Sequence, residues 1–149
     1  MQKRLHVLVV SNHWGLKASR PSVGIFVDRQ IASLERAGVR ISTFDIGNNY
    51  WPSHIMRKWL ELRRFVKKLN PDLVHGRYGT AVGFIAAFAG KPAVISFCGG
   101  DLLGGPSSST TLRQYAGVLL SNLAALRAKT MICMSEELRQ ALWWRKHEL

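Results

Sequence analysis

A histidine, an arginine and a tyrosine stand close together in the segment His75-Gly76-Arg77-Tyr78-Gly79, and these side chains suit a polar ligand. The guanidinium of Arg77 can pair with a phosphate or a carboxylate. The phenol of Tyr78 can stack on the face of a sugar or bond one of its hydroxyls. His75 is either a residue of such a pocket or a core histidine bonded to backbone, and the sequence leaves both open.

A second candidate segment, residues 96–104, combines two adjacent glycines with a cysteine and an aspartate. Gly99 and Gly100 allow a ligand to approach the backbone closely. Asp101 either accepts hydrogen bonds from sugar hydroxyls or caps the following turn, and both interpretations stay open. Cys98 has no recognisable base beside it, so we interpret it as a spectator rather than a nucleophile.

A long loop at residues 11–24 is the third candidate, and it contains Asn12, Gly15 and Gly24. Gly24 directly precedes a predicted helix, where free backbone N–H groups and the helix dipole favour an anion such as a phosphate. The loop matches neither the GxGxxG fingerprint nor the P-loop motif, which excludes a plain dehydrogenase and a P-loop enzyme. Because no CxxC motif or cysteine–histidine cluster has zinc spacing, the sequence predicts no metal site.

Strands and helices must position these segments, and short β-branched runs alternate with helical stretches along the chain. The near-continuous apolar runs are typical of strands buried on both faces of a parallel sheet. Strands are expected at residues 5–10, 39–44, 72–75, 93–97 and 130–134. Helices are expected at residues 26–36, 52–69, 80–89 and 111–128, with a last helix opening after an N-cap at Ser135.

This alternation predicts a single α/β domain over residues 1–149, a Rossmann-like doubly wound parallel sheet of about five strands with flanking helices. Ligands of such sheets bind outside the carboxyl ends of the strands. The site is therefore expected in the loops at residues 11–24, 45–52, 76–80, 98–110 and 135–136. Asn12 and Ser135 join the candidate sugar-binding residues because they follow the first and the last strand.

The chain is strongly basic, with 21 lysines and arginines against 9 acids and a net charge of +12. Such a charge favours nucleic acid, phospholipid head groups or phosphorylated substrates as partners. Because no helix-turn-helix, zinc-finger, RRM or KH signature is present, we expect no nucleic-acid partner. Six cations on the predicted helix at 52–69 either face a membrane or form an ordinary solvated face: Arg57, Lys58, Arg63, Arg64, Lys67 and Lys68.

Cysteine usage and the N-terminus predict where the protein works. Cys98 and Cys133 lie in apolar runs, which is typical of a reducing compartment. The N-terminus predicts a first strand rather than a signal peptide, because its apolar run is short and no small-residue cleavage site follows. No apolar run approaches the roughly 20 residues of a spanning helix. We therefore expect a cytoplasmic protein, peripheral at the inner face of the membrane if the basic helix docks there.

Several loose motifs recur in a fixed order and spacing from about residue 5 to about residue 142. Together they resemble the N-terminal Rossmann-like domain of the family-4 retaining glycosyltransferases, which have the GT-B fold. The motifs are Val9-Val10-Ser11-Asn12; Gly24-Ile25-Phe26-Val27 with Arg29, Gln30 and Leu34; Pro71-Asp72-Leu73-Val74-His75 with Tyr78-Gly79; Lys91-Pro92 with Cys98-Gly99-Gly100-Asp101; and Ala128, Ile132, Ser135 and Leu138.

The resemblance implies roles for these segments. In that family the N-terminal domain mainly binds the acceptor, while a C-terminal domain holds the nucleotide-sugar donor and a Glu-x7-Glu motif. Gly15 and Gly24 would belong to the loop that approaches the donor phosphate. His75 and Tyr78 would line the acceptor pocket, and residues 98–101 would lie near the transferred sugar.

This sequence also departs from the family pattern. Arg77 stands where the family often has a second histidine, Cys98 replaces the histidine of the second loop, and Gly24 lacks a second adjacent glycine. The chain stops at Leu149 without a Glu-x7-Glu motif or a nucleotide-reading loop, so we expect little or no sugar transfer from it alone.

The resemblance predicts the acceptor-binding half of a glycosyltransferase that acts on a glycan or lipid-linked acceptor in cell-envelope or exopolysaccharide synthesis. No cofactor is expected beyond the nucleotide-sugar donor of the complete enzyme, and the donor-binding domain would be missing or separate. Two alternatives stay open, a non-catalytic glycan- or membrane-binding module and a subunit of a two-chain transferase.

Overall fold

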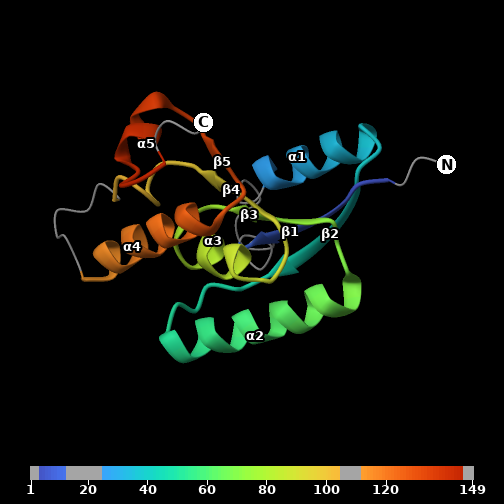
Figure 1. Ribbon diagram of the computed structural model, residues 1–149, viewed down its shortest axis with the longest axis horizontal. Coiled ribbons are helices and arrows are strands. Elements are labelled where there is room, and N and C mark those ends of the chain that lie inside the picture. The colour runs from blue at the N-terminus through green and yellow to red at the C-terminus, as the bar shows by residue number, and fades with distance from the viewer. Residues whose placement is uncertain (1–3, 13–24, 105–111, 146–149) are drawn as a thin grey trace.

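A five-stranded parallel sheet forms the centre of the molecule (Figure 1). The computed structural model describes residues 4–12, 25–104 and 112–145. The strands follow the spatial order β2-β1-β3-β4-β5, and every neighbouring pair is parallel, which confirms the predicted sheet. Their bounds are β1 His6–Ser11, β2 Arg40–Asp45, β3 Leu73–Arg77, β4 Ala93–Phe97 and β5 Thr130–Cys133.

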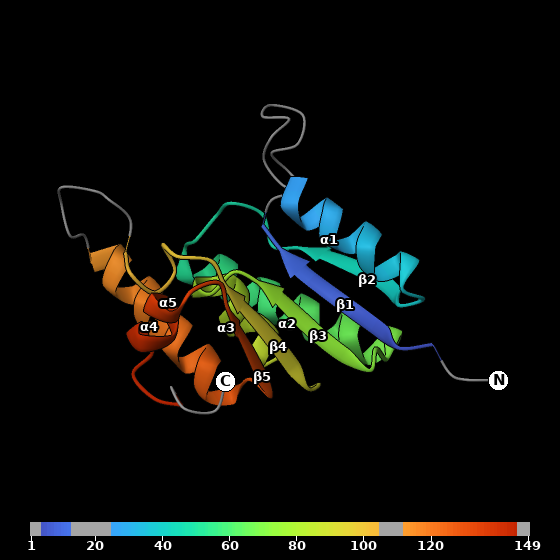
Figure 2. The same cartoon turned by 90° about the horizontal axis from the view of Figure 1, so that it is seen from above.

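Helices alternate with the strands and cover both faces of the sheet. Their bounds are α1 Ile25–Arg36, α2 Pro52–Leu69, α3 Thr80–Ala87, α4 Leu112–Arg127 and α5 Glu136–Ala141. Helix α1 lies on one side of the sheet and α2 on the other (Figures 1 and 2). Within the described ranges, no helix is long and apolar enough to span a bilayer.

Alternate residues of β1 enter two separate hydrophobic layers, as the two-residue period of a strand requires. Leu8 and Val10 belong to the larger layer, which also contains buried residues of α2, α3 and α4. Val7 and Val9 belong to the smaller layer, beside Val27 of α1. The strand is therefore buried on both faces, which explains its continuous apolar run.

Helix α2 has the bounds that its apolar spacing predicts. Leu62 and Val66 are buried, and the ring N–H of Trp59 donates to the carbonyl of Phe88 at 3.0 Å. A proline opens the helix, where its missing N–H costs nothing. Asn70 closes it in the left-handed conformation. The opposite face of the helix, which carries the cations, is left to solvent.

The register of the central strands brings the ends of β1, β3 and β4 together. Val10 pairs with Gly76, and the next residue, Arg77, pairs with Ser96. Helix α3 approaches β3 closely, since a Cβ at Gly76 would lie 3.0 Å from Ala86 Cβ and 3.3 Å from Gly83 Cα. The residues that follow these strands share one edge of the sheet, where ligands of doubly wound sheets bind.

Candidate functional site

The buried carboxylate of Asp101 joins two loops at this edge of the sheet. Its Oδ2 accepts a hydrogen bond from the backbone N–H of Gly79, and its Oδ1 accepts one from Gly99, both at 2.8 Å. The N–H of Cys98 lies 3.1 Å from Oδ2 and 3.2 Å from Oδ1. Asp101 is 0% exposed, so its carboxylate caps and links the two loops. A contact between Asp101 and a sugar stays a prediction.

The β3–α3 turn holds Tyr78 in a strained backbone conformation. Tyr78 has a φ of 107° and Thr80 a φ of 47°, values that non-glycine residues rarely adopt. Ser121 on α4 supports the turn, since its hydroxyl accepts from the N–H of Thr80 and donates to the carbonyl of Asp101, both at 2.7 Å. Together with the Gly79–Asp101 bond, this fixes two successive N–H groups and places Tyr78 in the wall of a cavity.

Two buried polar atoms at this edge lack a hydrogen-bond partner among the described residues, the Nε of Arg77 and the Oδ1 of Asn12. Asn12 is 9% exposed, and its Nδ2 donates to the hydroxyl of Tyr50. A guanidinium N–H is a donor and an amide oxygen an acceptor, so the first suits an oxyanion or a hydroxyl oxygen and the second a hydroxyl hydrogen. Because a buried polar group without a partner is costly, each of the two atoms is a candidate contact for a ligand.

His75 lies in the core. It is 5% exposed, and its Nε2 is 2.8 Å from the hydroxyl of Ser96. Burial, and secondarily the charge of Arg77, lowers the pKa of His75 to about 4 from an ordinary 6.5. The imidazole is therefore neutral near pH 7. This agrees with the core alternative, with a serine hydroxyl as partner where the sequence suggested backbone.

The second loop combines a poorly reactive thiol with open space. Burial raises the pKa of Cys98, Arg77 acts in the opposite direction, and Asp101 raises it further. A raised pKa leaves little thiolate, which agrees with the spectator interpretation. Gly99 adopts a φ of 135°, and a Cβ at Gly100 would lie 3.0 Å from the hydroxyl of Tyr78. The glycine at position 100 thus leaves the space beside this phenol free.

The remaining predicted residues are Ser135, Gly15 and Gly24. Ser135 is the N-cap of α5, as predicted, and its hydroxyl accepts from the N–H of Leu138 at 3.3 Å. A role of Ser135 in sugar binding stays a prediction. Gly15 and Gly24 lie outside the described residues. In the described part of the chain, no three histidine, cysteine or acidic side chains are grouped so that they could hold a metal ion.

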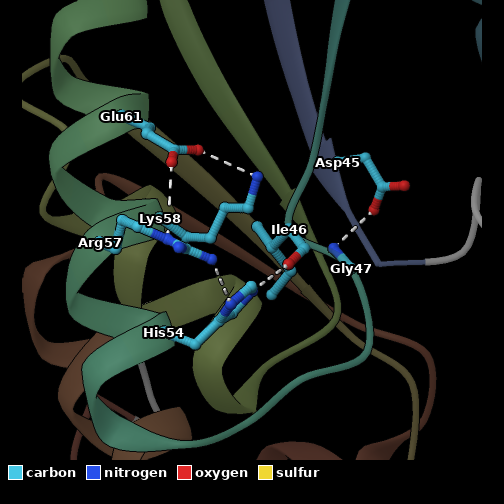
Figure 3. Close-up of polar contacts among 7 residues, drawn as sticks. All are labelled: Asp45, Ile46, Gly47, His54, Arg57, Lys58 and Glu61. Carbon is cyan, nitrogen blue, oxygen red and sulfur yellow. Dashed lines mark hydrogen bonds and ion pairs between the residues drawn. The ribbon is translucent and has the colours of Figure 1, made fainter.

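The first two cations of α2 contact other side chains of the same helix, and one of these, His54, also contacts the preceding loop (Figure 3). Arg57 and Lys58 lie 3.8 and 3.0 Å from the carboxylate of Glu61. The Nε2 of His54 is 3.1 Å from the carbonyl of Ile46, and its Nδ1 is 3.0 Å from the guanidinium of Arg57. Because a carbonyl only accepts, the imidazole donates from Nε2 and accepts at Nδ1.

The later cations of α2 are exposed and carry uncompensated charge. For these side chains the described ranges contain no ion pair, although the guanidinium of Arg63 lies 5.1 Å from the ring centre of Trp59. Met56 and Leu60, 55% and 45% exposed, precede them on the same helix. We name this group the basic end of α2: Arg63, Arg64, Lys67 and Lys68.

Two neighbouring cavities near this edge were not predicted from the sequence. Tyr50 and Arg113 line both of them. Tyr50 lies in the loop at 45–52, which the fold class had marked as part of the expected site. Arg113 lies in the first turn of α4, and no local motif connects it to the distant loop that it contacts.

These observations define the class of the protein. It is a Rossmann-like α/β domain with its candidate site at the carboxyl ends of β1, β3 and β4. Residues 3–146 match the family described as "Glycosyl transferase 4-like domain". The chain therefore belongs to the glycosyl transferase 4-like family, which confirms the resemblance found in its motifs. No curated protein matches the sequence significantly.

Several solved structures share the fold. A putative UDP-N-acetylglucosamine 2-epimerase from Listeria monocytogenes matches with a TM-score of 0.67 and 14% identity over 94% of this chain and 41% of that one. The UDP-GlcNAc 2-epimerase of Methanocaldococcus jannaschii gives a TM-score of 0.61 and 13% identity over 94% and 42%. At such identities the likeness concerns the fold alone, that of one half of a GT-B architecture. The chain spans about two fifths of the length of these proteins.

Proposed function

We propose that this chain is the acceptor-binding half of a glycosyltransferase and that it binds a glycan or lipid-linked acceptor at the carboxyl edge of its sheet. Its family and the share of its structural neighbours that it spans support this proposal. A donor-binding domain outside the described residues would hold the nucleotide sugar. Because group transfer needs both reactants held in register, the chain alone is expected to bind an acceptor without transferring sugar to it.

The unpartnered pair at the sheet edge carries the proposal. The Nε of Arg77 and the Oδ1 of Asn12 are buried without hydrogen bonds from the described residues; Arg77 ends β3, and Asn12 directly follows β1. A sugar offers a partner to each atom, since one of its hydroxyls can accept from the guanidinium and another can donate to the amide oxygen. Tyr78 lies next to Arg77 and presents a ring with which a sugar face can stack.

Replacing Arg77 with glutamine is expected to weaken binding of a sugar phosphate at least about tenfold, because a hydrogen bond to a charged group is lost. Binding would be measured by NMR titration with glucose 1-phosphate and N-acetylglucosamine 1-phosphate. We expect the backbone amides of residues 12, 77–79 and 98–100 to shift. The matched control is Arg40→Gln, which removes an exposed arginine at the opposite end of the sheet. Equal binding by Arg77→Gln and the native chain would contradict the proposal.

We also propose that the basic end of α2 holds the protein at an anionic membrane surface on the cytoplasmic side. Its four cations lie on one helix with no carboxylate partner among the described residues. Exposed Met56 and Leu60 add apolar surface on the same helix. Basic helices with such apolar neighbours bind at the interface of anionic bilayers.

Glutamine at all four positions of the basic end is expected to lower partitioning onto phosphatidylglycerol vesicles by more than about tenfold, since each cation near an anionic surface contributes about 1 kcal/mol. Co-sedimentation would measure this partitioning, with phosphatidylcholine vesicles for comparison. The control removes four exposed cations elsewhere, at Arg36, Arg40, Arg127 and Lys129. If both quadruple variants lose binding equally, net charge rather than this surface attracts the protein to the vesicles.

A further inference from the structure

A large apolar groove runs between α2, α3 and α4, next to the candidate site. Its volume is about 760 Å³, within the range of about 300 to 1,000 Å³ that is usual for ligand pockets. The rings of Phe84 and Phe88 contact each other in its wall, with centres 4.8 Å apart and planes tilted by 41°. Apolar side chains from the other two helices complete the walls, among them Ile55, Trp59, Leu119 and Leu120.

A second cavity of about 570 Å³ adjoins the groove and is polar. Asn48, Asn49 and Trp51 line it, together with Tyr50 and Arg113, which both cavities share. The guanidinium of Arg113 lies 5.1 Å from the ring centre of Tyr50. A cation thus lies at the boundary between an apolar groove and a polar cavity, and the described residues of both linings include no acidic side chain.

We infer that these two cavities together bind one lipid phosphate, with its hydrocarbon chain in the groove and its phosphate beside Arg113. The inference rests on the proposed acceptor function and narrows the acceptor to a lipid-linked one. An extended peptide or glycan in the groove would bury polar groups against apolar walls, whereas a hydrocarbon chain has none to satisfy. The exposed guanidinium, with no acid among the described residues that line the polar cavity, provides the charge complementarity for a phosphate.

The head group of such a lipid would reach the candidate site directly. Tyr50 lines both cavities, and its hydroxyl accepts a hydrogen bond from the Nδ2 of Asn12. The Oδ1 of the same asparagine has no hydrogen-bond partner among the described residues. Tyr78 lines the groove as well, and Arg77 precedes it. One amphipathic ligand can therefore contact the groove, Arg113 and the sheet edge together.

Alkyl phosphates test the groove without knowledge of the natural acceptor. Hexyl, octyl and decyl phosphate would be titrated calorimetrically into the 149-residue chain below their micelle concentrations. Affinity is expected to rise about fourfold for each methylene that enters the groove, and inorganic phosphate should not bind measurably. Decyl maltoside, which is neutral, is expected to bind about tenfold more weakly than decyl phosphate. An affinity independent of chain length would overturn the inference.

Two pairs of matched variants on α4 locate the ligand. Ala116 is exposed and lines the groove, so Ala116→Trp should fill it and weaken decyl phosphate binding more than about tenfold. Leu126→Trp changes an exposed residue outside the groove and should have no effect. Arg113→Gln should weaken binding of decyl phosphate but not of decyl maltoside, while Arg127→Gln should change neither. Native-like binding by Ala116→Trp would overturn the inference, and circular dichroism would verify that each variant folds.

Failure of this inference and failure of the proposed function give different results. If sugar phosphates shift the amides at the sheet edge but alkyl phosphates do not bind, the result supports the proposed acceptor site and contradicts the binding of a hydrocarbon chain in the groove. If alkyl phosphates bind in the groove and sugar phosphates shift no amide signal at the sheet edge, the result supports the lipid site and contradicts the proposed sugar site. A dimer in sedimentation analysis that Ala116→Trp abolishes, without alkyl phosphate binding, would overturn the inference in favour of an interface between two copies.

Discussion

Replacing Asp101 with alanine is expected to lower the free energy of unfolding by about 3 to 5 kcal/mol, because one buried and two partly buried N–H groups lose a charged acceptor. Those donors are Gly79, Cys98 and Gly99, and Asp101 itself is 0% exposed. The effect should be large because the donors come from two loops that this carboxylate bonds directly to each other.

Chemical denaturation followed by circular dichroism would measure the loss. Asp101→Asn is the matched control, since it keeps the shape and one acceptor oxygen but turns an NH₂ group toward a backbone donor. We expect Asn to cost about half as much as alanine. A native-like midpoint for Asp101→Ala would mean that water replaces the carboxylate and that the loops do not depend on it.

The same variant separates two interpretations of Asp101. If the residue supports the site only by holding the loops, sugar phosphate binding and stability should fall together in Asp101→Ala and recover together when the loops are stabilised by ligand or osmolyte. If the carboxylate contacts sugar, binding should stay weak after the fold is restored. The buried geometry favours the first result.

Local patterns predicted the scaffold well. The apolar spacing of residues 55, 59, 62, 66 and 69 predicts one face of α2, and the helix has the expected bounds. Ser135 predicts the start of α5 through a hydrogen bond that spans only three residues. Such features depend on neighbours in the sequence, so a pattern of a few residues suffices to predict them.

The site depends on contacts between distant segments, and the sequence did not predict these contacts. Asp101 presented two local alternatives, and its bond to Gly79, 22 residues away, accounts for the buried orientation of its carboxylate. Ser121 is a small polar residue in a helix, and no local pattern indicates a role for it. In the structure it supports the strained turn at Thr80, 41 residues away. The groove arises from the packing of three helices, which no single periodicity describes.

Acid is expected to destabilise the protein through His75. The pKa of His75 is about 4 in the folded protein against an ordinary 6.5, so between these values the unfolded chain binds a proton that the folded chain does not. The free energy of unfolding should therefore fall as the pH drops from 6.5 toward 4 and level off below, with a total loss of about 3 kcal/mol from this residue. Lowered pKa values at Glu61 and Glu136 confine their contributions to pH below about 4.5.

His75→Gln provides the decisive comparison because glutamine can still bond the Ser96 hydroxyl but does not titrate. Urea unfolding between pH 8 and pH 4.5 should show a shallower decline of stability for His75→Gln than for the native chain. Ser96→Ala is the matched control, since it removes the hydrogen bond yet keeps the buried imidazole and hence the decline. If His75→Gln and the native chain lose stability in parallel, the imidazole is protonated in the folded state. In that case the charge of Arg77 and the burial of His75 do not keep the proton away.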